Sequence, residues 1–158
     1  QKKFESAPSF SSKAKSIALT NYGDKGSVYS EVQSNFGDYY YFLKNSAAYQ
    51  IDDFRSQRKK NLIEAIQYYQ NAIVSLVDSF KIQDPLIDPP LDHVISEIQL
   101  VEQFKKKALA LENLGDIYLS EFDYTNSFKF FNASLNSMIK SIELIHRLQI
   151  GFENEEES

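Results

Sequence analysis

The residue types that most often carry catalysis are sparse in this chain and far apart. The two histidines, His93 and His146, lie in different segments, and neither is followed by a second histidine at helical spacing. Cysteine is absent, which excludes a thiolate zinc site, a disulfide framework and a cysteine nucleophile. No Gly-rich phosphate loop and no local order of Ser, His and Asp is present. The sequence therefore predicts a protein that is not an enzyme and needs no metal or cofactor, with a helical enzyme whose site is assembled in space as the least favoured alternative.

Residues 55–60 form a basic run. Such a run can hold an anion, because guanidinium groups bind phosphate oxygens in a bidentate manner. A run of this kind is more often a solvated helix face, and we favour that interpretation for this run and for residues 105–107. The candidate anion contacts are Arg55, Arg58, Lys59 and Lys60.

Composition excludes several classes of partner. Asp and Glu number 22 against 17 Lys and Arg, so the net charge is −5, unlike the positive balance that nucleic-acid backbones attract. No apolar run approaches the ~18 residues of a membrane span. We therefore expect no nucleic acid and no membrane span, and a cytoplasmic location. Residues 1–26 are basic, Ser-rich and expected to be partly disordered apart from one short helix, whereas 151–158 form an acidic, flexible tail.

Apolar periodicity predicts an all-α protein of antiparallel helices in residues 27–150. We expect helices over about 27–50, 56–80 and 94–118, and a last one that begins at a cap on Thr125 or Asn126 and ends at Gly151. Residues 51–56 and 82–92 are the expected breaks, with Asp88 or Asp92 capping the third helix. The expected buried faces include Val28, Val32, Phe36, Tyr39 and Leu43; Leu62, Ile66, Tyr69, Ile73, Leu76 and Phe80; and Phe128, Phe131, Leu135, Met138, Ile142, Ile145 and Leu148.

The chain also contains an internal repeat. Residues 35–40 and 113–118 both carry Asn, then an apolar residue, Gly, Asp and a Tyr, and each is followed by a helix with aromatic residues. The Asp after each glycine, Asp38 and Asp116, is expected to bond between helices. A helix pair with a small residue at the crossing resembles a tetratricopeptide repeat. Residues 113–135 match that unit well, whereas the first copy has about 15 extra residues between its helices.

A second resemblance is carried by the run from Gly37 to Leu43. It is similar to the Gly-Asp-Tyr-Tyr-Arg-Tyr-Leu motif in the fifth helix of 14-3-3 proteins, and residues 69–72 and 110–113 resemble the following helices. The resemblance covers roughly residues 27–148. It implies a non-catalytic signalling adaptor whose concave groove binds phosphoserine or phosphothreonine peptides.

The same resemblance implies a set of peptide-binding residues. Asn113 falls on the family's backbone-binding Asn, and Ser34 falls near a groove Lys. Tyr41 and Phe42 fall on the phosphate-binding Arg-Tyr pair, so the arginine is replaced here. The family's dimer-forming first helices are not recognisable in residues 1–26, so a homodimer stays an open alternative. The second hypothesis is a tetratricopeptide-like scaffold that binds unmodified peptides.

Overall fold

The computed structural model describes residues 12–21, 23–43 and 51–157, with side chains over 12–21, 23–43 and 54–151. Residues 12–21 are helical, and the longer helices are α2 (Ser27–Leu43), α3 (Ile51–Ser75), α4 (Glu97–Ser120) and α5 (Tyr124–Glu157). Within the described ranges the only β-pairing is an isolated bridge between Val77 and Val94. The expected all-α antiparallel array is confirmed. No helix within these ranges is both long and apolar enough to cross a bilayer.

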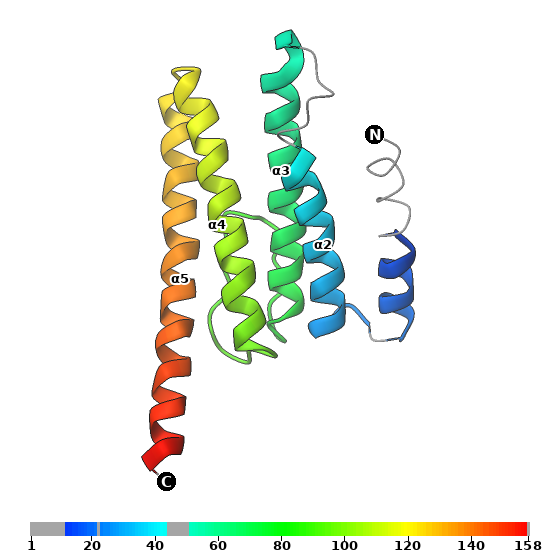
Figure 1. The fold of residues 1–158 in the computed structure, drawn as a ribbon, viewed down its shortest axis with the longest axis vertical. Coiled ribbons are helices and arrows are strands. Elements are labelled where there is room, and N and C mark those ends of the chain that lie inside the picture. The colour runs from blue at the N-terminus through cyan, green and yellow to red at the C-terminus, as the bar shows by residue number, and fades with distance from the viewer. Residues whose placement is uncertain (1–11, 22, 44–50, 158) are drawn as a thin grey trace.

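The four long helices stand side by side in chain order, so that each packs on the next (Figure 1). α2 packs on α3 and α4 packs on α5, and the two pairs meet where α3 contacts α4. α2 also reaches α4 at a few positions. The molecule is therefore an array of two helix pairs, and its first and last long helices are far apart.

The core has two clusters, one toward each end of α3. One surrounds Leu62, Ile66 and Tyr69 with residues of α4 and α5. The other joins Ile73 and Leu76 to Phe104 of α4 and Leu144 of α5. The buried face predicted for residues 56–80 is confirmed, since its six residues are at most 8% exposed, although Leu76 and Phe80 lie beyond the end of α3.

The ends of α3 differ from the expectation. The helix begins at Ile51, so the predicted polar break at 51–56 is helical. It ends at Ser75, where the Lys25 ammonium donates to the carbonyls of Val74, Val77 and Phe80 at 2.7, 2.9 and 2.8 Å. A cation is stabilised at a helix C-terminus by the unpaired carbonyls and the helix dipole. The contact with Lys25, about 50 residues away in the sequence, thus stabilises the end of α3. The local sequence around Ser75 could not indicate this end.

The predicted caps are also corrected. Ser96, not Asp88 or Asp92, caps α4, because its side chain accepts from the backbone N–H of Gln99 at 3.4 Å. Asp123 caps α5, because its carboxylate accepts from the backbone N–H of Asn126 at 3.1 Å.

The C-terminal end of α5 is a further correction. The helix continues through Gly151 to Glu157, because one glycine costs a helix only about 1 kcal/mol.

The predicted buried face of α2 is confirmed at Phe36 and wrong at Val28, and that of α5 is wrong in large part. On α2 the buried residues are Ser30, Gln33, Ser34, Phe36 and Gly37, whereas Val28 is 40% exposed. On α5 the buried side is formed by Ala133, Leu144 and three serines, while several large apolar residues face outward. Closely approaching helices bury small residues, so the largest side chains do not mark the contact face.

The two helix pairs cross in the same way. A Cβ added to Gly37 would lie 2.5 Å from the Tyr69 ring, and one added to Gly115 would lie 2.8 Å from the Phe131 ring. Near each crossing a serine hydroxyl donates to an alanine carbonyl: Ser30 to Ala72 at 3.0 Å, and Ser134 to Ala108 at 2.6 Å. When the two helix pairs are superposed by sequence position, Ser30 corresponds to Ala108 and Ala72 to Ser134. The same hydrogen bond therefore recurs with donor and acceptor exchanged between the helices. The internal repeat is therefore a repeat of helix-pair geometry.

Candidate functional site

A groove opens where α2 and α4 approach each other over α3. It encloses about 250 Å³ and is lined by Asp38, Tyr41 and Phe42 of α2, Tyr69 of α3, and Lys106 and Leu109 of α4. The close packing of Gly37 on the Tyr69 ring brings α2 near α3 and so positions the residues that line the groove. The groove wall thus combines an acid, a base and phenolic rings with apolar surface.

Two of the predicted peptide-binding residues, Asn113 and Tyr41, meet at the edge of this groove, where Tyr41 lines it and Asn113 lies behind Tyr41 and Leu109. The Asn113 amide donates to the Tyr41 hydroxyl at 3.2 Å and to the Leu109 carbonyl at 2.8 Å. The pair bridges α2 and α4, and the amide oxygen is an acceptor of the kind that pairs with peptide N–H groups. Phe42 is 70% exposed at the groove edge, which makes it an apolar contact for a ligand.

Ser34, the fourth predicted residue, lies deeper and is 3% exposed. Its hydroxyl accepts from the Lys106 ammonium at 3.0 Å. The structure therefore brings all four predicted residues to the α2–α4 interface, with Ser34 beneath Lys106 instead of at the groove surface.

Lys106 and Asp38 are groove residues that sequence reasoning did not assign to the site. The Lys106 ammonium lies 3.1 Å from Asp38 Oδ2 and 3.6 Å from Glu102 Oε1. Asp38 also accepts from the Tyr69 hydroxyl at 2.7 Å, so the expectation that it bonds between helices is confirmed. The available signal was spacing: Lys106 lies seven residues before Asn113, which is two turns along the same helix face.

Electrostatics distinguish this groove from a free anion pocket. Two carboxylates already neutralise Lys106, so an incoming phosphate dianion would meet Asp38. Burial, then the hydrogen bond to Asp38, raises the pKa of Tyr69 far above its usual value. The Tyr69 hydroxyl therefore stays protonated and continues to donate to Asp38.

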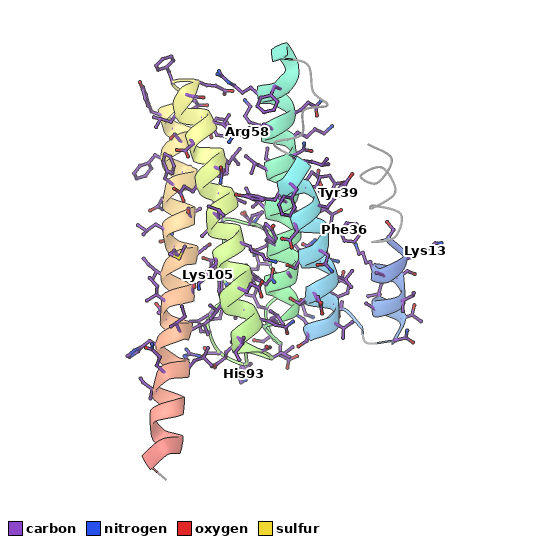
Figure 2. The ribbon with its side chains drawn as sticks, viewed as in Figure 1. Lys13, Phe36, Tyr39, Arg58, His93 and Lys105 are labelled. Carbon is purple, nitrogen blue, oxygen red and sulfur yellow. The ribbon has the colours of Figure 1, made fainter. Side chains whose placement is uncertain are left out.

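The four candidate anion contacts lie elsewhere. Arg55 and Arg58 line a second pocket of about 310 Å³ with Asp116 and Ser120, at the end of the array where α3 begins and α4 ends (Figure 2). Lys59 pairs with Glu121 at 2.9 Å and Lys60 is exposed. The basic run on α3 therefore lies level with the part of α4 that follows Asn113. The structure does not bring Arg55 or Arg58 to Tyr41.

The run at residues 105–107 is not uniformly solvated, which corrects the sequence interpretation. Lys107 is fully buried and donates to Gln70 Oε1 at 2.7 Å, to the Pro85 carbonyl at 3.0 Å and to the Asp88 carboxylate. Asp88 also accepts from Ser137 of α5 at 3.1 Å. This polar network joins the 82–92 loop to three helices, and it explains why Asp88 is unavailable as a cap.

A third concave region, of about 610 Å³, lies away from the groove. It is open and mostly polar, and it is lined by the turn before α2 and the end of α3. Its lysine, Lys25, already donates to three carbonyls. Across the described ranges no three His, Cys, Asp or Glu side chains come together as a metal site.

Comparison with known proteins yields two short matches. One is a Cysteine--tRNA ligase of Azobacteroides pseudotrichonymphae genomovar. CFP2, 24% identical over 87 residues, which are 54% of this chain and 18% of that protein. Another is a Cysteine--tRNA ligase of Phocaeicola vulgatus, 32% identical over 63 residues, which are 39% of this chain and 13% of that protein. The chain thus spans less than a fifth of either relative. No family model and no solved structure matches the chain.

Proposed function

We propose that this protein is a non-catalytic adaptor that binds a peptide segment of a partner protein in the α2–α4 groove. The observation that carries the proposal is the Asn113–Tyr41 pair, which joins the two helices that form the groove. The Asn113 amide oxygen and the Asp38 carboxylate offer acceptors to peptide N–H groups, and Phe42 offers an exposed apolar contact. A groove of this composition suits one extended segment better than a small substrate.

The charges favour an unmodified peptide over a phosphorylated one. A phosphopeptide site needs unpaired cations converging on one point. Here Lys106 is paired with Asp38, and the arginines line a different pocket with Asp116. The repeated helix-pair crossing also supports the tetratricopeptide-like alternative, whose concave surfaces bind peptides. A phosphate-dependent, 14-3-3-like mode is the second candidate, and its support is the placement of Asn113 and Tyr41 on one groove.

Fluorescence anisotropy distinguishes the two modes. A degenerate phosphoserine peptide pool and its unphosphorylated counterpart are titrated with the protein at two salt concentrations. We expect binding of the unphosphorylated pool to be equal or tighter, since a phosphate would face Asp38. Tighter, salt-sensitive binding of the phosphorylated pool would favour the 14-3-3-like mode.

A matched pair of variants tests the site itself. Asn113→Ala removes the groove amide, whereas Asn132→Ala removes an exposed amide on α5. Loss of one such hydrogen-bonding group costs about 0.5–1.5 kcal/mol, or roughly 2- to 12-fold in affinity. We expect that loss for Asn113→Ala alone. Failure of both peptide pools to bind, or equal effects of the two variants, would overturn the proposal.

A further inference from the structure

The outer face of α5 carries an uncovered apolar stripe. Among the described long helices α5 contacts only α4, and it forms the outer edge of the array (Figure 1). The side chains of the stripe are large, apolar and well exposed. They are Tyr124 (64%), Phe128 (73%), Leu135 (58%), Met138 (38%), Ile139 (43%) and Ile142 (58%).

The inner face of α5 has the opposite character. Ser127, Ala133, Ser137 and Ser141 are buried, together with Leu144 near the lower end. A terminal helix of a helical array ordinarily turns small or apolar residues inward and polar residues outward. α5 turns its small residues inward and its largest apolar residues outward, so its outer face resembles a second contact face.

The spacing of the stripe favours another helix as the covering element. Within the stripe, Phe128, Leu135 and Ile142 recur every seven residues, and Met138 follows Leu135 by three. A seven-residue apolar repeat is the pattern of a seam between supercoiled helices. α5 has 34 residues, or about 51 Å of helix, which is long enough for such a seam.

We propose that the covering helix is α5 of a second copy of this chain, packed antiparallel. A large apolar side chain presents about 150–250 Å², so the exposed fractions leave about 600 Å² of this stripe open on each chain. Pairing two stripes buries about 1,200 Å², above the ~1,000 Å² that a specific interface needs. A twofold axis pairs the stripe of one copy with the same stripe of the other. The dimer therefore needs no second contact surface on the chain.

The heptad positions define the register of this pair. With the twofold axis midway between Leu135 and Met138, Leu135 lies opposite the partner's Met138. A parallel pair would set the acidic ends of the two helices, whose sequence holds four glutamates between 153 and 157, against each other. An antiparallel pair places these ends at opposite ends of the seam. Avoided like-charge repulsion therefore favours the antiparallel arrangement.

Light scattering after size-exclusion chromatography tests the association. We expect the mass to rise from one chain to two as concentration increases. Leu135→Glu should raise the dimer Kd by about tenfold or more, since two charges enter the seam. Ile98→Glu is the matched control, because Ile98 is 69% exposed on α4, outside the stripe. A wild-type protein that stays monomeric, or equal effects of the two variants, overturns the proposal.

Cross-linking tests the orientation independently. Because the chain has no cysteine, a single introduced cysteine reports only its own neighbourhood. In the antiparallel register Met138→Cys lies on the seam, with its two copies about 4.5 Å apart along the helices, whereas His146→Cys copies lie about 28 Å apart. A short bismaleimide should link the first and not the second. Linking of the second, as a parallel pair would give, overturns the proposed register.

Discussion

Replacing Lys107 with methionine should destabilise the fold far more than its position in a lysine run suggests. The side chain is fully buried, and its ammonium donates to the Asp88 carboxylate, the Gln70 amide oxygen and the Pro85 carbonyl. Methionine fills a similar volume and makes none of these bonds. The Asp88 carboxylate then keeps Ser137 as its remaining side-chain partner among the residues described.

The magnitude follows from the stranded charge. Removing one partner of a buried ion pair costs about 3–5 kcal/mol, because the other charge stays desolvated. That is a large share of the ~5–15 kcal/mol that stabilises a domain. Asp88→Asn in the Lys107→Met background removes the stranded charge and should recover part of the loss.

Urea unfolding followed by circular dichroism measures these free energies. Lys105→Met is the control, since Lys105 lies two residues away and is exposed (Figure 2). We expect Lys105→Met to change stability by less than about 0.5 kcal/mol. If Lys107→Met costs no more than Lys105→Met, or if Asp88→Asn adds to its cost, the reasoning about a buried pair is refuted.

A buried lysine also predicts a pH dependence. Burial lowers the pKa of Lys107 in the folded protein, and Asp88 opposes that shift. Between this lowered pKa and the ordinary value of 10.5, the unfolded chain binds more protons at this site than the folded one. The stability of the wild type relative to Lys107→Met should therefore rise as pH increases toward 10.5. A flat difference across that range would contradict the lowered pKa.

Three further predictions concern the crossings, the buried phenol and the end of α3. In Gly37→Ala and Gly115→Ala the added methyl group meets an aromatic ring, which should cost about 1–3 kcal/mol, partly offset by a helix-propensity gain of about 1 kcal/mol. Gly151→Ala has open space around it and should be neutral or stabilising. Urea unfolding measures all three variants. The pKa of Tyr69 is raised in the folded protein, so above pH 10 this phenol ionises only in the unfolded chain. The free energy of unfolding should therefore fall there by up to about 1.4 kcal/mol per pH unit. Tyr69→Phe should remove that slope in alkaline titrations. Lys25→Met removes the cation from three carbonyls and should lower the thermal midpoint by an amount equivalent to about 1–2 kcal/mol; an unchanged midpoint would contradict its capping role.

The helices differed in how well their faces could be predicted, and the reason is the size of the residues they bury. α3 lies between two neighbours and buries Leu62, Tyr69 and Ile73, so its periodicity indicated the right face. α2 and α5 each approach one partner closely through glycine, alanine or serine. Their large apolar residues, such as Val28 and Leu135, are exposed. Hydrophobic periodicity marks a contact face only where the contact is made by large side chains.

The candidate site was predictable only in part. The motif resemblance singled out Asn113 and Tyr41, and the two side chains are in contact. Lys106 and Asp38 were not assigned to the groove, and nothing in the spacing along the chain indicated that they would pair across 68 positions. That pairing changes the chemistry of the groove, because it neutralises the lysine that lines it.

By itself, the sequence determined the helical class, the existence of two related helix pairs and the scarcity of catalytic groups. These properties depend on composition and on spacing within one helix turn or two, so they are local. The tertiary structure decided which lysine is buried, where α3 ends and which face of α5 stays uncovered. Each of those outcomes depends on groups from separate segments meeting in space, and the free energy of such a contact is not encoded in either segment alone.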